Sequence, residues 1–364
     1  MRFPEFSGEW KETTLGKIAE ITKGSGISKD QLSEQGSPCI LYGELYTKYK
    51  SEIINGVYSR TELDSSPLVK SKANDVIIPC SGETAIDIST ARCVLFNNIL
   101  LGGDLNIIRL KYDDGGFFAY QLNGARKKDI ARVAQGVSVV HLYGENLKHI
   151  RVYHPAIEEQ KKIARLLSLI DERITTQNKI IEKLESLIRG LCLKLVSQGI
   201  PNTALNTCLE CHSSILQEKS VTTDGKYPVY GAAGICGYSN TPEASGDSIL
   251  IIKDGASVGA TFYVSGEYSA IGTLNRLTAR SGCSLRYLYY CLKIFDFSQY
   301  KTGQTIPHIY FRDYGIAKIW CPSLAQQEHI AGILTSIDTK IQMERSLLER
   351  LTIQKRFLLQ KMFI

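Results

Sequence analysis

The sequence predicts an α+β protein in which two tandem domains of mixed helices and strands are separated by two long antiparallel coiled-coil helices, as a pseudo-twofold internal repeat. Three observations predict this fold class. A helical segment recurs at a fixed spacing, its apolar residues follow a heptad pattern, and short β-like runs fill the rest of the chain. With 364 residues, the chain is also longer than one compact core usually organises.

The repeat and the helix boundaries divide the chain into four parts. We expect the two mixed domains at residues 1–154 and 201–321, and the two helical segments at residues 155–200 and 322–364. Proline at the start of a helix is tolerated, and Gly199-Ile200-Pro201 is typical of a helix end.

The internal repeat covers more than the helices. The 42-residue stretch that begins at Pro155 recurs 167 residues downstream at Pro322, without a gap and with about 12 identical positions. The same offset continues upstream, where Gly136 aligns with Gly303 and His141 with His308. A chance likeness of two amphipathic helices does not explain these upstream matches, so we predict a tandem duplication of the whole unit.

Apolar residues alternate at spacings of four and three along both helical segments, which is the pattern of a coiled-coil seam. The two seams contain Ile163, Leu167, Ile170 and Ile174 in the first helix, and Ile330, Leu334, Ile337 and Ile341 in the second. Additional apolar residues such as Leu166 and Ile333 widen the stripe, so each helix is expected to pack on more than one neighbour.

Each seam has a polar residue at the same position, Gln177 in the first helix and Glu344 in the second. Two interpretations remain open, a buried polar layer that fixes the register or a locally solvated notch. At 1.5 Å per residue, about 40 residues form a helix roughly 60 Å long. Two similar helices would most simply pair antiparallel and hold the two domains apart.

The sequences of the two domains predict short strands joined by many loops. Runs such as 75–79, 105–110 and 248–252 are broken by glycine, serine, asparagine and aspartate, and one helix is expected near 117–123 and another near 285–295. Loop residues with polar, basic or aromatic side chains are candidates for DNA contacts, although each is also compatible with an ordinary solvated loop. These candidates are Tyr42, Glu44, Tyr46, Lys48, Ser81, Arg126, Lys127, Lys128, Tyr230, Lys253, Arg276, Lys301 and Gln304.

Bulk properties allow nucleic-acid binding and predict a cytoplasmic protein. The net charge of +6 is only mildly basic, and we find neither an apolar signal core at the N-terminus nor a run long enough to span a membrane. The ten cysteines are scattered singly, which favours reduced and mostly buried thiols over a disulfide framework.

Motifs for catalysis are missing from the sequence. We find no phosphate-binding loop, no dinucleotide fingerprint and no Asp/Asn-Pro-Pro-Tyr/Phe signature of an amino-methyltransferase, so we expect no cofactor site and no catalytic residue. The stretch Cys208-Leu209-Glu210-Cys211-His212 matches a haem-attachment pattern and half of a zinc site, but it lacks a second Cys/His pair, so we expect no metal here. His141 and His308 are either structural hydrogen-bonding residues, which we favour, or DNA contacts.

Over essentially its whole length, the chain resembles the specificity subunits of type I restriction–modification enzymes. The residues that carry this resemblance are Gly303-Gln304-Thr305-Ile306-Pro307-His308-Ile309, the Gln326-Gln327-x-x-Ile330-Ala331 helix start, and Leu15-Gly16-Lys17-Ile18-Ala19 near the N-terminus. The first copy departs from the pattern at residues 137–141, where Thr-Ile-Pro is absent.

The resemblance implies a non-catalytic DNA-recognition subunit. Each domain would be a target recognition domain for one half of a bipartite site in double-stranded DNA. The helices would set the spacer and dock two methyltransferase subunits, which makes the eight seam residues candidates for partner contacts. S-adenosylmethionine would bind to the methyltransferases, and ATP and magnesium to restriction and motor subunits. No membrane partner is expected.

Two other functions remain open from the residues alone. A stand-alone DNA-binding regulator would bind DNA without a methyltransferase. A coiled-coil scaffold protein would bind no DNA, so DNA-shift assays with and without a methyltransferase subunit separate these functions.

Deleting one heptad from each long helix should change the preferred spacer between half-sites or abolish binding. Two domains held on one face of B-DNA select half-sites about a helical turn apart, so the helix length acts as a ruler. A site-selection assay measures the spacer, and an unchanged preference would count against the ruler.

Overall fold

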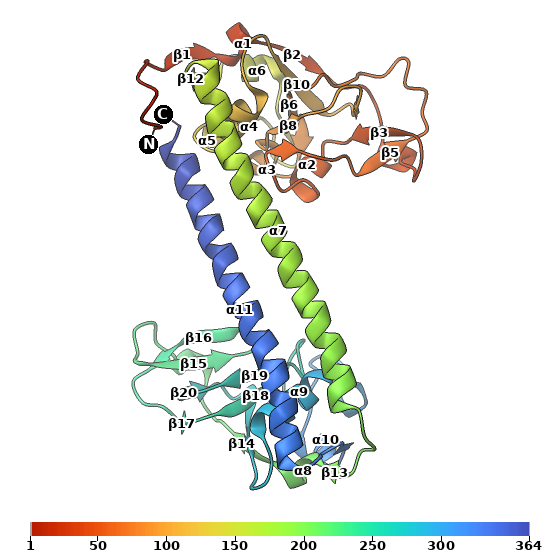
Figure 1. Ribbon diagram of the computed structural model, residues 1–364, viewed down its shortest axis with the longest axis vertical. Helices are drawn as coiled ribbons and strands as arrows, with labels where there is room; N and C mark the ends of the chain where they lie inside the picture. Colours follow the sequence, from red (N-terminus) through yellow and green to blue (C-terminus); the bar gives the residue numbers. More distant parts are fainter. Residues whose placement is uncertain (1, 364) are drawn as a thin grey trace. The chain divides into compact units, whose positions relative to one another are not determined.

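The computed structural model describes residues 2–363 and divides the chain into two compact units (Figure 1). The first unit comprises Met1–Asn178 and Ser346–Ile364, and the second comprises Lys179–Arg345. Each unit therefore contains a domain of mixed helices and strands together with part of both long helices. Within the described residues, none of the helices combines the length and the apolar character that crossing a membrane requires.

The first unit is built around a five-stranded sheet with the strand order β2-β10-β6-β8-β4. Its strands are β2 (Ala19–Lys23), β4 (Ile53–Ile54), β6 (Asp75–Pro79), β8 (Arg92–Val94) and β10 (Leu105–Leu110). A second sheet joins β5 (Ser59–Thr61), β3 (Ser37–Ile40) and β9 (Leu100–Leu101), and two pairs join β1 (Lys11–Thr14) to β12 (Arg151–His154) and β7 (Ser81–Gly82) to β11 (Val140–His141). The short helices are α1 (Leu15–Ile18), α2 (Glu44–Thr47), α3 (Ala85–Ile88), α4 (Gly115–Asn123), α5 (Lys127–Val133) and α6 (Gly144–Lys148).

The core of the first unit forms where α4 packs on β6 and β8. Strand β6 is buried along its whole length, as is α4 from its first residue to Leu122. Asp114 caps α4 by accepting a hydrogen bond from the Phe117 backbone N–H at 2.7 Å. Asp75 is buried in β6 and is neutralised by Arg109 at 2.7 Å, which satisfies a carboxylate that would otherwise be costly to bury.

The second unit contains two four-stranded sheets. The first has the order β14-β21-β18-β19, from β14 (Leu209–Ser213), β21 (Leu274–Ala279), β18 (Ser248–Ile252) and β19 (Thr261–Val264). The second has the order β16-β15-β20-β17, from β16 (Gly234–Ser239), β15 (Tyr227–Gly231), β20 (Glu267–Ala270) and β17 (Ala244–Ser245). The remaining elements are the pair β13 (Thr203–Ala204) and β22 (Lys318–Ile319), and the helices α8 (Leu205–Cys208), α9 (Leu285–Ile294) and α10 (Phe311–Tyr314).

Strand pairing repeats between the two units. The order β2-β10-β6-β8 in the first corresponds to β14-β21-β18-β19 in the second, and the pair β1–β12 corresponds to β13–β22. In both units one strand is paired with a parallel and an antiparallel neighbour, β3 with β9 and β5, and β15 with β20 and β16. The predicted internal duplication is confirmed, as are the strands expected at 75–79, 105–110 and 248–252.

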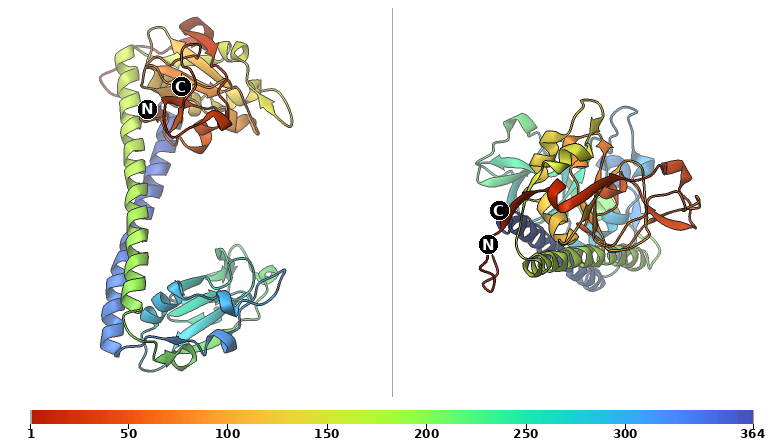
Figure 2. Two further views of the ribbon diagram at one scale, coloured as in Figure 1. Left: turned by 90° about the vertical axis from the view of Figure 1, so that its right-hand side faces the viewer. Right: turned by 90° about the horizontal axis from the view of Figure 1, so that it is seen from above.

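The long helices are α7 (Ile157–Val196) and α11 (Leu324–Lys361), close to the predicted segments (Figure 1 and Figure 2). In the first unit, Ile163 and Leu167 near the start of α7 share a core with Leu358 near the end of α11. In the second unit, Cys192 near the end of α7 shares a core with Leu334 near the start of α11. Within each unit the start of one helix thus meets the end of the other, which is the antiparallel pairing predicted from the sequence.

The eight predicted partner residues of the seams lie in these intrachain cores. Ile163, Leu167, Ile170, Ile330, Leu334 and Ile341 are buried, and Ile174 and Ile337 are partly buried against the same cores. Their side chains are therefore covered by this chain itself, because each helix packs on its domain as well as on the other helix. Partner contacts at these eight residues remain a prediction, and in the chain by itself most of their surface is already covered.

A buried charged network ties the end of α11 to the first unit. Lys355 Nζ lies 2.5 Å from Glu52 and 2.6 Å from Asp171, and Tyr120 Oη donates to Asp171 at 2.8 Å. The second unit repeats the tyrosine–aspartate pair, in which Tyr290 Oη donates to Asp338 at 2.8 Å. Because two carboxylates and one ammonium group leave water together, the first network depends on all its members being present.

Replacing Lys355 with methionine should destabilise the packing of the last turns of α11 against the rest of the first unit. The substitution removes the cation that is ion-paired with Glu52 and Asp171 and leaves only the buried Arg92 to offset their charge, which costs about 3–5 kcal/mol. Hydrogen-exchange mass spectrometry of the full chain should show lost protection in the peptides that cover residues 346–363. Arg345→Met is the matched control, because Arg345 lies on the same helix as Lys355. This substitution breaks a half-exposed ion pair with Glu185 of α7 and should cost less than about 1 kcal/mol.

The defect of Lys355→Met should shrink as the pH falls. Burial raises the pKa of Glu52, and in the native chain Lys355 opposes this effect. Without the lysine, the folded state binds a proton more readily than the unfolded state, so acidification favours the folded state. A loss of protection, measured against the native chain at each pH, that is the same at mildly acidic and neutral pH would contradict this explanation.

Candidate nucleic-acid interface

In the first unit, three loops line a cleft of about 890 Å³. They contribute residues from 26–32, from 41–48, and Gly103 and Asp104. The chain turns here because β3 ends at Ile40 and the single-turn helix α2 begins at Glu44. The predicted residues Tyr42, Tyr46 and Lys48 all line this cleft, together with Lys29 and Gln31, which the sequence did not single out.

Glu44 has a structural role in this loop. Its side chain is buried, and its carboxylate accepts hydrogen bonds from the Leu41 backbone N–H at 3.0 Å, from Lys48 Nζ at 2.6 Å and from Ser59 Oγ. These three donors occupy the carboxylate and hold α2 in place. Glu44 also lines the cleft, and its buried carboxylate anchors the loop that carries the neighbouring candidates, while a DNA contact by Glu44 remains a prediction.

Ser81 is also buried, but its loop borders the same cleft. Its hydroxyl donates to Asp104 at 3.1 Å, so it is not exposed for a ligand as the sequence suggests. The following residue, Gly82, lies so close to Tyr46 that a Cβ there would be 3.8 Å from the Tyr46 hydroxyl. Burial raises the pKa of Tyr46, and Tyr42 adds to the effect, so the Tyr46 hydroxyl keeps the proton that it can donate.

The basic run Arg126–Lys128 provides fewer exposed cations than the sequence suggests. Arg126 lies over the Tyr153 ring at 5.0 Å and 3.5 Å from Asp129. Lys127 is half-buried, and desolvation lowers its pKa, with a further contribution from Arg92. Lys128 is the exposed member of the three.

The second unit distributes its candidates over two places. Arg276 on β21 lines a small cavity of about 190 Å³ with His212 and Tyr268, and Tyr230 packs edge-to-face on Tyr268 at 5.8 Å. Lys253 directly follows β18, and its carbonyl accepts a hydrogen bond from the Ile309 N–H at 2.9 Å. This hydrogen bond brings Lys253 near the loop that carries Lys301 and Gln304.

Residues 302–308 form a closed loop with an exposed tip. The Thr302 N–H donates to the His308 carbonyl at 2.9 Å, and the His308 N–H donates back to Thr302 at 2.8 Å. Gly303 has φ +87°, and a Cβ there would lie 2.4 Å from the Ile306 carbonyl oxygen, so the turn requires glycine. Lys301 and Gln304 are both exposed, and the His308 imidazole pairs with Asp254 at 2.7 Å.

The first unit contains the same loop at residues 135–141. The Gln135 N–H donates to His141 at 2.9 Å, the His141 N–H donates back at 2.7 Å, and Gly136 has φ +115°. Its tip residue Val137 is 96% exposed and occupies the position of Gln304. The sequence did not identify Val137 as a site residue, although the 167-residue offset aligns it with Gln304.

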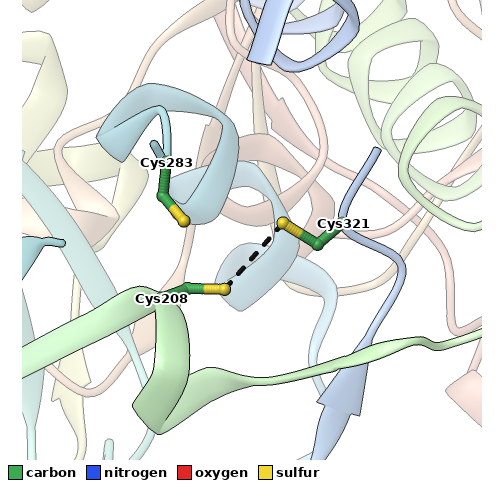
Figure 3. Close-up of side chains that lie close together, drawn as sticks. All are labelled: Cys208, Cys283 and Cys321. Atoms are coloured by element: carbon green, nitrogen blue, oxygen red, sulfur yellow. Dashed lines mark hydrogen bonds between the residues drawn. The ribbon is translucent and has the colours of Figure 1, made fainter. Parts of the chain in front are cut away.

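The motif Cys208-Leu209-Glu210-Cys211-His212 does not assemble as a unit. His212 Nε2 lies 3.2 Å from Thr278 Oγ1, whereas Cys208 lies beside Cys283 and Cys321 (Figure 3). The partners of Cys208 are thus remote in the sequence, which is why local spacing could not reveal them.

Comparisons with known proteins agree with the fold. A solved S subunit of a type I restriction–modification system from M. genitalium superimposes with a TM-score of 0.75 at 20% identity, covering 100% of this chain and 99% of that one. A second solved chain, from work on assembly of the type I R-M system, gives a TM-score of 0.56 at 14% identity, covering 98% and 97%. At these identities the likeness shows the fold.

Relatives in sequence are specificity subunits. A provisionally named type I specificity subunit of Mycoplasma pneumoniae is 24% identical over 277 residues, which are 71% of this chain and 68% of the relative. The specificity subunit of a type I restriction enzyme from Methanocaldococcus jannaschii is 24% identical over 202 residues, 55% of this chain and 44% of the relative.

The family model described as "Type I restriction modification DNA specificity domain" matches residues 7–186 and 210–352. These two matches cover most of both halves of the chain and confirm the resemblance inferred from the sequence. The chain therefore belongs to the family of type I restriction–modification DNA specificity proteins.

Proposed function

We propose that this protein is the DNA-sequence-recognition subunit of a type I restriction–modification complex, with the domains at 1–154 and 201–321 each recognising one half of a bipartite site. The observation that carries this proposal is the duplicated unit, in which both copies present a closed loop, at 135–141 and 302–308, with an exposed tip. A loop held by backbone hydrogen bonds, with a tip that differs between the two copies, suits the major groove, because base edges are read by a few side chains on a rigid support.

The two domains would contact DNA with different chemistry. In the second, Gln304 is suited to a bidentate contact with adenine, and Lys301 to a phosphate. In the first, Val137 offers an apolar tip suited to a thymine methyl group, and Tyr42, Tyr46, Lys48 and Lys29 offer donors around the cleft. This difference supports an asymmetric bipartite target.

The long helices would set the spacer and dock two methyltransferase subunits. Since the seam is buried, the docking surface would use the exposed apolar side chains of the helices. The large ones among these are Leu169, Ile180, Leu187 and Leu193 on α7, and Leu324, Ile333, Met343, Leu347, Ile353 and Phe357 on α11. Methyltransferase and motor subunits would supply the chemistry, with S-adenosylmethionine, ATP and magnesium bound to them, in a cytoplasmic complex.

Co-expression of the full chain with its methyltransferase subunit tests the proposal. We expect a complex with two methyltransferase subunits per chain, methylation at one bipartite motif, and an affinity for DNA that falls steeply with salt because phosphate contacts release counterions. Methylated motifs are mapped by sequencing genomic DNA. Tight specific binding by the chain alone, or salt-independent binding, would count against it.

Gln304→Ala should relax recognition at one base pair of one half-site. Loss of a bidentate contact corresponds to about 1–3 kcal/mol of discrimination, roughly 5- to 150-fold, at that position. Selection from randomised sites measures the change, and the other half-site should keep its preference. The exposed Gln198 lies two residues after the end of α7, and Gln198→Ala should leave both half-sites unchanged.

Gly303→Ala should disturb the same half-site more broadly, because the loop cannot close around a Cβ at this position. Gly266→Ala is a matched control, since Gly266 has nearly the same φ of +86° but nothing within 4 Å of an added Cβ. Equal recognition by both variants would show that the conformation of the 302–308 loop is unimportant for DNA binding.

A further inference from the structure

Three cysteine sulfurs converge at the base of α11 in the second unit (Figure 3). Cys208 ends α8, Cys283 lies two residues before α9, and Cys321 lies three residues before α11. All three sulfur atoms lie within 4.8 Å of one another, and those of Cys208 and Cys321 are 3.9 Å apart. Segments that are far apart in the sequence thus present three soft ligand atoms to one point.

The spacing of the sulfurs fits coordination of one ion. With a zinc–sulfur bond of about 2.3 Å, two thiolates on the same zinc are roughly 3.8–4.0 Å apart. The Cys208–Cys321 separation already has this value, and Cys283 needs to move by at most about 1 Å. A disulfide would need a sulfur–sulfur distance near 2.05 Å and would leave the third thiol unused.

The protein holds the backbone at each cysteine in place. The Arg280 N–H donates to the Cys208 carbonyl at 2.8 Å, and the Cys283 N–H donates to Arg280 at 3.2 Å, so these two positions are linked through one residue. The Cys321 N–H donates to Asn202 Oδ1 at 2.8 Å, and Asn202 Nδ2 donates back to the Cys321 carbonyl at 3.1 Å. Ligands fixed in this way lose little freedom when an ion binds.

Gln327 supplies a hydrogen bond to one of the sulfurs. Its Nε2 donates to Cys321 Sγ at 3.3 Å and to the Pro322 carbonyl at 2.8 Å, while its Oε1 accepts from the Ser284 N–H at 2.9 Å. These bonds orient the amide so that its N–H group faces the sulfur. Donors to the ligand atoms are typical of metal sites, where they stabilise thiolate charge.

In the first unit, the positions that correspond to the three cysteines hold other residues. Gln160 occupies the position of Gln327, and its Nε2 donates to Asp113, which pairs with His154 at 2.9 Å. His154 aligns with Cys321 at the 167-residue offset. Asp113 directly precedes the capping residue of α4, and Cys283 directly precedes the capping residue of α9. Ile18 is the last residue of α1, and Cys208 is the last residue of α8. The first unit thus has an aspartate–histidine contact at the place where the second unit has three thiols.

We propose that Cys208, Cys283 and Cys321 bind one soft divalent cation, with zinc as the ion whose geometry fits. Three thiolates leave the fourth tetrahedral position to water, which can enter because Cys283 and Cys321 are half-exposed. The ion links α8 to the segments that start α9 and α11, so it stabilises the base of the second unit. A thiol that coordinates the ion gives up its proton, so binding should weaken as the pH falls.

Titration of the reduced, chelator-treated full chain with Co²⁺ alone tests this site. Tetrahedral cobalt–thiolate coordination gives charge-transfer and visible d–d absorption, which should saturate at one equivalent and disappear when Zn²⁺ is added. Zinc should also raise the melting temperature of the chain. Cys283→Ser should weaken Co²⁺ binding by about tenfold or more, since it removes one of three ligands at a half-exposed position that tolerates the change.

Cys236→Ser and Cys211→Ser are the matched controls. Cys236 is exposed and Cys211 is half-buried, both are in the second unit, and neither belongs to the three-cysteine site. Both variants should bind Co²⁺ like the native chain. Absence of the absorption in the native chain, equal binding by Cys283→Ser, or a Cys208–Cys321 disulfide found by mass spectrometry in protein purified with zinc would each overturn the proposal.

Discussion

Leu358 near the end of α11, together with Met362 and Phe363 that follow it, joins a core whose other buried members come from the first 170 residues. Lys355, also near the end of α11, enters a pocket of two carboxylates, Glu52 and Asp171. Apolar burial provides the attraction, and the charged network permits only the arrangement in which both carboxylates meet a cation. The first unit is therefore complete only with the C-terminal helix in place, and the antiparallel pairing of α7 with α11 in this unit follows from that requirement.

The two copies of the duplicated unit share the residues that attach the long helices to their domains, but they differ at neighbouring positions. Tyr120–Asp171 and Tyr290–Asp338 occupy equivalent positions, as do Gln160 and Gln327. Beside these shared residues, the first unit has an Asp113–His154 contact and the second has Cys283 and Cys321. Helix caps and helix-to-domain hydrogen bonds maintain the fold, so the neighbouring positions could acquire different chemistry without loss of the fold.

In the candidate interface, too, the groups that maintain the fold are different from those offered to a ligand. Backbone hydrogen bonds and a glycine with positive φ hold the loops at 135–141 and 302–308, and the tip side chains take no part in closing them. A substitution at Val137 or Gln304 therefore changes the surface offered to DNA and leaves the loop intact. In the first unit, the buried Glu44 similarly holds α2 while its neighbours Tyr42 and Tyr46 line the cleft.

The sequence by itself determined the duplication, the two long helices and several strands, because heptad spacing and a fixed offset are visible in the order of residues. It also predicted DNA contacts at Tyr42, Tyr46, Lys48 and Gln304, which line the cleft or the exposed loop tip and remain predictions. Only the tertiary structure decided that Glu44 and Ser81 are buried and that the seam residues are covered within the chain. Burial depends on neighbours that are distant in sequence, and for the same reason Cys208, Cys283 and Cys321, more than 110 residues apart at the extremes, could be recognised as a group only once the chain was folded.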